Sequence, residues 1–398
     1  MGTVADNPLV GGHGFGLTTM ILIPAIVEIW MCTPEGARTI CLDYVTESEY
    51  ALLCNDRAPF RLKLPQRFDR KLIKLDNIIE IWRGFEPGTL RMDYCGLVRA
   101  WKFSDDAGSD YTELYGYSLL DLLRRRIVAY KADTAQASMT DQADDMIKAI
   151  VKDNLGSDAI AARNLTSVGG GFTIQADLAD GASITKAFSH KNVLEICREI
   201  AAASAQAGTE VFFDIIPTAT NTGTGGLAFQ FQTFTGQRGS DRTADSDTSA
   251  FVGTSWGNLQ NGSLESDYSD EINYGYVLGQ GDESSRETAE ATDAVRSGMS
   301  IWNRCEGTKD ARNTEQGDTA ALTGDGNTYL AENMPKFRFG GDIVETPAFR
   351  YGREFFHGDR VTAAYGGYMV DCLISTVTVS RDSEGNEMIT ARLEVEEG

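Results

Sequence analysis

Two short stretches, IVEIW at residues 26–30 and IIEIW at residues 78–82, decide how the first part of the chain folds. In each stretch aliphatic residues alternate with a glutamate and a tryptophan, which is the period-two pattern of a β-strand. The wholly aliphatic face of each strand is expected to lie on a core. The other face is then expected to point outward. Its polar and aromatic residues are Glu28, Trp30, Glu80 and Trp82.

The same alternation continues through the first 117 residues and predicts five or six short strands joined by turns. Two amphipathic helices are expected next, at 140–156 and 189–208, each opened by a capping residue and ended by a glycine. The chain then returns to strand patterns, and its end, 359–395, is typical of a β-meander. The predicted fold class is therefore a mixed, β-rich α+β protein.

These changes of pattern also predict the domain boundaries. We expect a flexible N-terminal arm at 1–16, a first β-module at 17–133, an α-containing module at 134–208 and a second β-module at 209–398. Polar, glycine-containing stretches at about 236–270 and 306–335 are predicted to be long loops of the second β-module.

Charge is abundant and unevenly distributed. The chain has 36 Lys and Arg residues against 58 Asp and Glu residues, a net charge of −22 that repels phosphate backbones and argues against tight nucleic-acid binding. Residues 57–74 are the exception, with seven basic side chains and one acid, whereas residues 241–300 hold twelve acids and three arginines. Either these are solvated surfaces, or they meet copies of the chain, head to tail, or other charged partners. The basic candidates for such a contact are Arg61, Lys63, Arg67, Arg70, Lys71 and Lys74.

No pattern points to a cofactor, a metal or a catalytic group. The seven cysteines are scattered without a CxxC spacing, which indicates reduced thiols in a protein made in a cytoplasm. The apolar run at 17–32 is interrupted by Pro24 and Glu28, so we expect neither a signal peptide nor a membrane span. The three histidines lack metal-ligand spacing, and nothing selects a catalytic pair among the many acids.

The outward face with the two glutamates and two tryptophans therefore has three possible interpretations. A catalytic dyad is the least supported, because no other catalytic signal accompanies it. An ordinary, half-exposed sheet face and a sheet face covered by a neighbouring subunit both remain. Two tryptophans cover more apolar area than an isolated domain usually exposes, which favours a subunit contact.

Several longer stretches, taken in order, resemble one known family. They are IIEIWRG (78–84), YGYSLLDLLRRRIVAY (115–130), ADDMIKAIVKDNLG (143–156), LEICREIAAASAQAGTEVFFDI (194–215), LAFQFQTFTGQRGSDRT (227–243) and YGREFFHGDRVTAAYGG (351–367). Together they are similar to the front, middle and rear parts of the tail-hub, or baseplate-hub, proteins of long-tailed bacteriophages, often described only as minor tail proteins. The resemblance covers about residues 20–395.

This resemblance implies a fold of two tail-tube-like antiparallel β-barrels with smaller α/β modules inserted. It implies a structural role and no enzymatic activity: a homotrimeric hub at the tail tip of the virion that helps to close the DNA channel. The partners implied are the distal tail protein ring, the tail tube protein, the tape measure protein and tail fibre or spike proteins. A receptor-binding or fibre-attachment protein, or a cell-wall-degrading tail enzyme, is the alternative.

Overall fold

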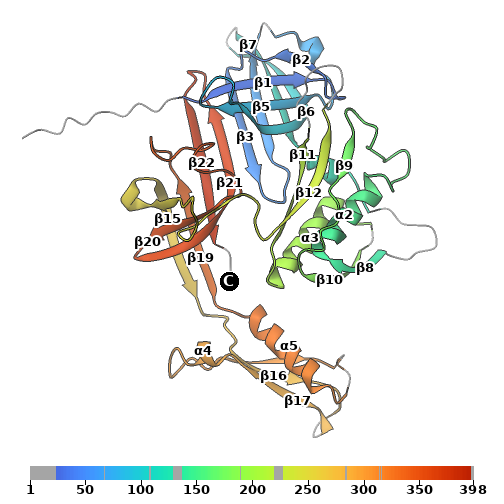
Figure 1. Cartoon of the computed structure of the whole chain (residues 1–398), viewed down its shortest axis with the longest axis vertical. Coiled ribbons are helices and arrows are strands. Elements are labelled where there is room, and N and C mark those ends of the chain that lie inside the picture. The colour runs from blue at the N-terminus through green and yellow to red at the C-terminus, as the bar shows by residue number, and fades with distance from the viewer. Residues whose placement is uncertain are drawn as a thin grey trace, which may run out of the picture.

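The computed structural model describes residues 24–66, 68–106, 109–128, 137–188, 190–218, 227–282, 285–312, 314 and 316–395. The predicted arm at 1–16 and the candidate Arg67 lie outside these residues. Figure 1 shows a β-rich body, a module with helices on one side of it, and a smaller module below.

The first part of the chain forms antiparallel strands, as its alternating pattern predicts. They are β1 (Ile26–Cys32), β2 (Arg38–Cys41), β3 (Glu47–Leu53), β4 (Pro59–Pro65), β5 (Ile78–Gly84), β6 (Arg91–Asp106) and β7 (Ser109–Ser118), with a 3₁₀ turn at Arg70–Leu72. The two similar pentapeptides are neighbours, because β1 pairs with β5. Glu28 lies opposite Trp82, and Trp30 lies opposite Glu80. The repeated pattern therefore builds one continuous face from two adjacent strands.

The last part of the chain supplies a second set of strands. They are β13 (Asp241–Arg242), β14 (Phe251–Gly253), β15 (Leu259–Asp267), β19 (Lys336–Ile343), β20 (Arg360–Tyr365), β21 (Tyr368–Arg381) and β22 (Glu387–Val395), with a 3₁₀ turn at Thr254–Trp256. The long strand β21 pairs with β22 on one side and with β3 on the other, from Thr376 opposite Leu53 to Arg381 opposite Ser48. The two ends of the chain therefore share one sheet.

Strand pairing differs here from the expected pair of barrels. Among the residues that the structure describes, fourteen strands join in one sheet in the order β15-β19-β22-β21-β3-β4-β7-β6-β5-β1-β2, with β13, β14 and β20 beside it. No pairing within this described part closes either half into a barrel. One hydrophobic core also spans both halves, since Ile81 of β5 and Val377 of β21 belong to the same buried cluster. The structure thus shows a single large sheet where two closed barrels were expected.

The α-containing module is larger than predicted. Its elements are α1 (Asp121–Arg124), β8 (Ala137–Gln142), α2 (Ala143–Asn154), β9 (Phe172–Ile174), β10 (Ser183–Phe188), α3 (Val193–Gln206), β11 (Val211–Pro217) and β12 (Phe229–Thr235). Strand β12 pairs with both β11 and β9, and the phenylalanines Phe213 and Phe231 pack in one core with both long helices. The module therefore continues past the expected boundary at residue 208, to the end of β12.

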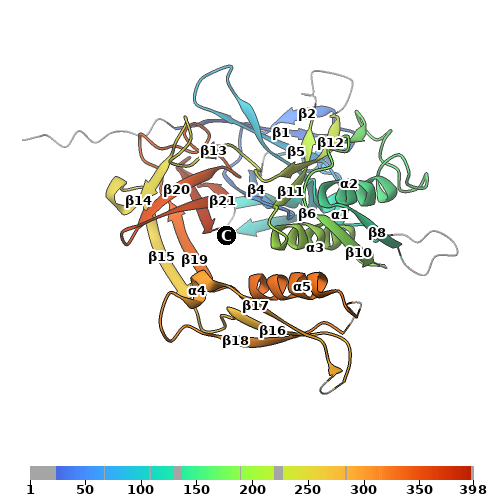
Figure 2. The same ribbon diagram turned by 60° about the horizontal axis from the view of Figure 1, so that its bottom comes forward.

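A second, smaller α/β module occupies most of the stretch expected to be a loop at 306–335. It consists of β16 (Tyr274–Leu278), β17 (Thr288–Thr292), α4 (Ala294–Ser297), β18 (Glu306–Asp310) and α5 (Thr319–Glu332). Helix α5 covers one face of the small sheet, as Figure 2 shows. The prediction of a long exposed loop there is wrong. The other expected loop, 236–270, contains the short strands β13 and β14 and the longer β15.

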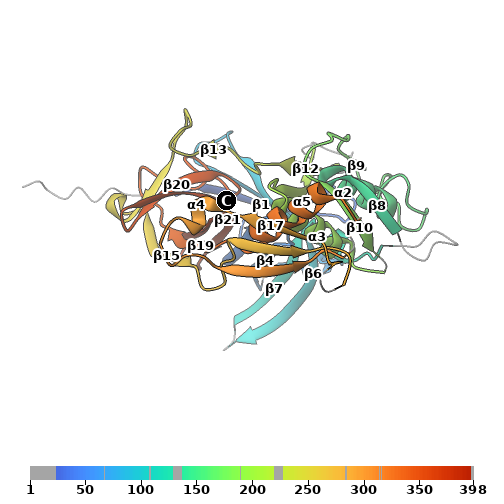
Figure 3. The same cartoon turned by 90° about the horizontal axis from the view of Figure 1, so that it is seen from below.

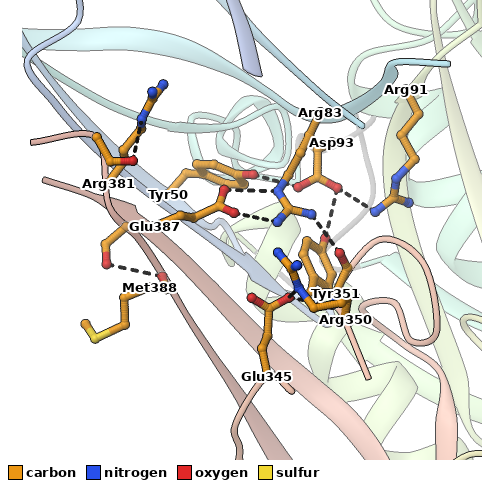
Figure 4. A network of polar contacts seen from close by, with 12 residues as sticks. Tyr50, Arg83, Arg91, Asp93, Glu345, Arg350, Tyr351, Arg381, Glu387 and Met388 are labelled. Carbon is orange, nitrogen blue, oxygen red and sulfur yellow. Dashed lines mark hydrogen bonds and ion pairs between the residues drawn. The ribbon is translucent and has the colours of Figure 1, made fainter. Parts of the chain in front are cut away.

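A buried polar network fastens the front of the sheet to the rear (Figure 4). The guanidinium of Arg83, on β5, donates from Nε and Nη2 to the carboxylate of Glu387, on β22, at 3.1 and 2.6 Å, and from Nη1 to the carbonyl of Tyr351 at 2.7 Å. Asp93 accepts hydrogen bonds from the hydroxyls of Tyr50 and Tyr351 at 2.6 and 2.9 Å. Because Arg83 is only 1% exposed, its charge depends on these partners.

Removing the carboxylate should therefore weaken the whole fold. We expect Glu387→Ala to lower the free energy of unfolding by about 3 kcal/mol, because it leaves the buried Arg83 charge uncompensated. The double variant Arg83→Met, Glu387→Leu should recover part of that loss, since no unpaired charge remains. Denaturant unfolding followed by circular dichroism measures both. Equal stability of Glu387→Ala and the wild type would contradict the assignment.

Candidate assembly surfaces

The face shared by β1 and β5 is organised by an arginine from the neighbouring strand β2. The guanidinium of Arg38 lies over both indoles, 4.7 Å from the ring centre of Trp30 and 5.2 Å from that of Trp82. It also donates from Nε and Nη2 to Glu80, at 3.0 and 2.8 Å. The two tryptophans are half-buried as a result, and Glu28 remains exposed. This part of the face can still meet a partner.

Glu80 itself cannot meet a partner, because its side chain is completely buried within the chain. Besides the arginine, it accepts hydrogen bonds from the indole of Trp82 at 2.9 Å and the thiol of Cys32 at 3.3 Å. Residues on the same face, Cys32 and Ile78, pack into the core of the α-containing module. The prediction that this end of the face points outward is therefore wrong, since the chain's own inserted module covers it.

A cavity of about 540 Å³ lies where the front strands, the α-containing module and the rear strands meet. Trp82, Asp93, Asp214, Arg238 and His357 are among the residues that line it. Burial raises the pKa of Asp214, although the ion pair with Arg238 at 2.8 Å opposes that shift. The accessible side of the half-buried Trp82 therefore faces this cavity inside the molecule.

One pair beside this cavity has the composition of a nucleophilic site. The sulfur of Cys54 lies 3.5 Å from Nε2 of His357, a neighbour 303 residues away that sequence spacing does not reveal. Burial raises the pKa of the Cys54 thiol to about 12 and lowers the pKa of His357 to about 3. A reactive cysteine needs the opposite shifts, toward a thiolate beside a protonated imidazole. The pair is therefore a half-buried structural contact and not a nucleophilic site.

Several cations of the basic stretch at 57–74 lie close to acidic side chains of the same chain, which the sequence does not reveal. Arg61 pairs with Glu113 at 2.5 Å, and Lys63 pairs with Glu47 at 2.7 Å, so both cations on β4 are neutralised by neighbouring strands. Arg70 lies 4.0 Å from Asp110. Within the described part of the chain, Lys71 and Lys74 are exposed and form no ion pair. The positive charge available to a partner is therefore concentrated in these two lysines.

Sequence reasoning missed two features of these surfaces. It did not identify Arg38, which belongs to no motif and gives no signal until β2 is known to lie beside β1. It also missed the exposed apolar side chains at 295–302, on α4 and the loop between α4 and β18. The tryptophan and isoleucine in that polar stretch, Ile301 and Trp302, were the available signal. No group of three or more potential metal ligands occurs among the described residues, and no described helix is long and apolar enough to cross a membrane.

The two sequence-related glutamates provide a matched test of burial. Glu80→Ala removes the acceptor for Arg38, Trp82 and Cys32 and should lower the free energy of unfolding by about 3 kcal/mol. Glu28→Ala, at the equivalent but exposed position of the neighbouring strand β1, should change it by less than about 0.5 kcal/mol. Denaturant titration of both variants decides the point, and equal effects would contradict the difference in burial.

His357 should make stability depend on pH. Its pKa falls from 6.5 to about 3 on folding, so the unfolded chain binds the proton more readily between these values. The stability present above pH 6.5 is therefore lost as the pH falls, by about 2 kcal/mol between pH 7 and pH 5. His357→Gln should remove this part of the dependence. Parallel profiles for the variant and the wild type would refute the assignment.

Comparison with solved structures shows a shared fold. The structure is similar to the tail protein from Neisseria meningitidis MC58, with a TM-score of 0.51 and 13% identity over 93% of this chain and 96% of that chain. It is equally similar to the 43 kDa tail protein of prophage MuSo2 from Shewanella oneidensis, with a TM-score of 0.51 and 11% identity over 93% and 98% of the two chains. No curated protein is detectably similar to the chain in sequence.

The sequence itself matches one family model over residues 27–393, which is nearly all of the chain. The match includes the front strands, both inserted modules and the rear strands. It therefore covers every surface considered above. The chain belongs to the family of Siphovirus ReqiPepy6 Gp37-like proteins.

Proposed function

We propose that this chain is a structural protein of a phage tail, the hub that joins the tail tube to the tip. The observation that carries the proposal is the family match over residues 27–393, to a family named for a siphovirus protein. Two tail proteins that share the fold over nearly their whole lengths support it.

In this proposal three copies form a ring around the DNA channel. The front and rear parts of the large sheet would take the places that tail-tube-like β-barrels occupy in such hubs, two from each copy. Partners would be the distal tail protein ring, the tail tube protein, the tape measure protein and tail fibre or spike proteins. The net charge of −22 would let DNA pass without binding, because like charges repel the phosphate backbone.

The subunit contacts would use the parts of the predicted interface that the fold leaves accessible. Trp30 and Glu28 lie on the uncovered end of the β1–β5 face, and Lys71 and Lys74 extend the basic surface beside the front strands. The paired cations of β4 would act indirectly, by holding that strand to its neighbours. Glu80 would hold the arginine of β2 in place over the two indoles.

Native mass spectrometry of the full chain tests the oligomeric state directly. The proposal expects a trimer, formed by the chain alone or on addition of the distal tail ring protein. A chain that stays monomeric at every concentration, and also in the presence of that protein, would count decisively against a hub.

The two unpaired lysines give a sharper test of assembly than the whole basic stretch. Lys71→Glu with Lys74→Glu should leave folding unchanged, because neither lysine has an ion pair to lose among the described residues, and should reduce the yield of intact tails by about tenfold or more. The measurement is complementation of a phage that lacks the gene, with tails counted by electron microscopy. Normal tail yield would show that the lysines are merely solvated.

A charge-matched control is available on the α-containing module. Lys152→Glu with Arg198→Glu makes the same change of charge at two exposed ion pairs, with Asp158 and Asp56. Exposed pairs of this kind contribute little to stability. This control should assemble normally. Reversal of Arg61 is not a suitable test, since a carboxylate there would face the acids of the neighbouring strands and disturb the sheet.

A further inference from the structure

Four strongly exposed apolar side chains gather on the short helix α4 and the loop that follows it in the small α/β module. Val295, Met299, Ile301 and Trp302, here called the apolar loop, are between 63% and 89% exposed. The small module buries its own core elsewhere, around Val277 and Leu322 under α5. Exposed apolar side chains gathered in this way mark an interaction site. The apolar loop is therefore a surface that lacks its partner in the isolated chain.

Buried polar groups hold the apolar loop in shape from below. Arg296 is anchored by its Nε to Asp293 at 2.7 Å, by Nη1 to Glu271 at 3.5 Å and by Nη2 to the carbonyl of Leu330 at 3.0 Å. The side-chain amide of Asn303 donates to the carbonyl of Arg296 at 2.9 Å and to Glu271 at 3.1 Å. A loop fixed in this way loses little conformational freedom on binding. Its apolar side chains are thus presented ready for contact.

The excess of acidic residues in the small module indicates the charge that a partner of the apolar loop would carry. Residues 271–335, which form the small module, contain twelve acidic and five basic residues. Asp270, just before the module, is among the exposed acids near it. An apolar loop on a module with an excess of acidic residues favours a partner that combines apolar and basic side chains, and disfavours an anionic lipid surface. The occupant should therefore be a basic, aromatic protein surface.

The chain itself has such a surface, on the hairpin of β6 and β7. Trp101 and Phe103, on one face of β6, are 41% and 47% exposed. The guanidinium of Arg70 stacks on Phe103, 4.5 Å from its ring centre, and Lys71 follows it in the chain. Figure 3 shows this hairpin extending beyond the rest of the molecule. The surface that Trp101 and Phe103 form with Arg70 and Lys71, here called the hairpin surface, therefore complements the apolar loop in both charge and apolar character.

We propose that the apolar loop of one copy docks on the hairpin surface of the next copy. The inference rests on the proposed function, in which several copies surround a channel, and it names the contact between them. The loop lies on the module below the body and the hairpin projects in another direction, so one molecule does not bring them together (Figures 1 and 3). Different patches of identical subunits that meet in this way generate a closed ring when the rotation closes.

Photo-cross-linking locates the contact. The full-length chain is prepared with benzoylphenylalanine in place of Trp302, irradiated, and digested for mass spectrometry. The proposal expects cross-links between two copies that map to residues 70–75 or 99–103. Cross-links to any other part of a second copy, or no cross-linked dimer at all, would overturn it.

Sedimentation velocity of full-length variants tests the energetics. Ile301→Asp with Trp302→Ser should weaken self-association by about tenfold or more, because it removes the two most exposed anchors. Ile160→Asp with Val168→Ser, at apolar positions of the α-containing module that are 69% and 49% exposed, should leave self-association unchanged. Equal effects of the two variants would contradict a specific site.

Two further measurements distinguish docking between copies from membrane binding and from failure of the hub proposal. Binding of the chain to neutral phosphatidylcholine vesicles that is lost in Ile301→Asp with Trp302→Ser would assign the apolar loop to a membrane and overturn the docking proposal. The hub proposal fails independently, if purified tails lack the chain. In that case the cross-links would still decide whether the loop and the hairpin meet.

Discussion

The pairing of β3 with β21 is the constraint on which the rest of the structure depends. It joins strands more than 300 residues apart in sequence and makes one sheet of the two ends of the chain. The α-containing module follows the front strands and the small module is inserted between two rear strands, so this pairing fixes where the two modules lie relative to each other. The hydrophobic core beneath this sheet is then built from apolar side chains of both the front and the rear strands.

Polar groups inside this junction make the pairing specific. The Arg83–Glu387 pair and the bonds of Asp93 to Tyr50 and Tyr351 come from both ends of the chain (Figure 4). A shifted register would leave a buried guanidinium and a buried carboxylate without partners, at a cost of several kcal/mol each. The junction therefore favours one arrangement of front and rear, which suits a protein that works by holding its neighbours in a defined geometry.

The local alternation of apolar and polar residues was enough to predict the strands. The burial of individual side chains depends on packing against residues distant in sequence, which the local pattern does not show. The period of two in IVEIW and IIEIW correctly predicted strands and an aliphatic core face. The opposite face contains both an exposed Glu28 and a buried Glu80, and the difference arises from Arg38 and the α-containing module, which are distant in sequence. Nothing local distinguishes the two glutamates.

The missed helix α5 has a similar cause. Its sequence includes Gly324 and Gly326 and lacks a clear apolar face, which favours a loop when read alone. A side chain at Gly326 would approach Ala291 and Val277 to less than 3 Å, so this glycine lets the helix lie close to the small sheet. The basic stretch shows the same limit, since its sequence cannot reveal that acids on neighbouring strands neutralise the two cations of β4.

The fold of this protein leaves accessible the surfaces that the proposed assembly would use. The central claim, that copies of this chain form the hub of a tail, is tested most directly by a cryo-electron microscopy map of the intact tail. We predict density for three copies of the chain at the distal end, around the channel. Density in another part of the particle, or none at all, would contradict the claim.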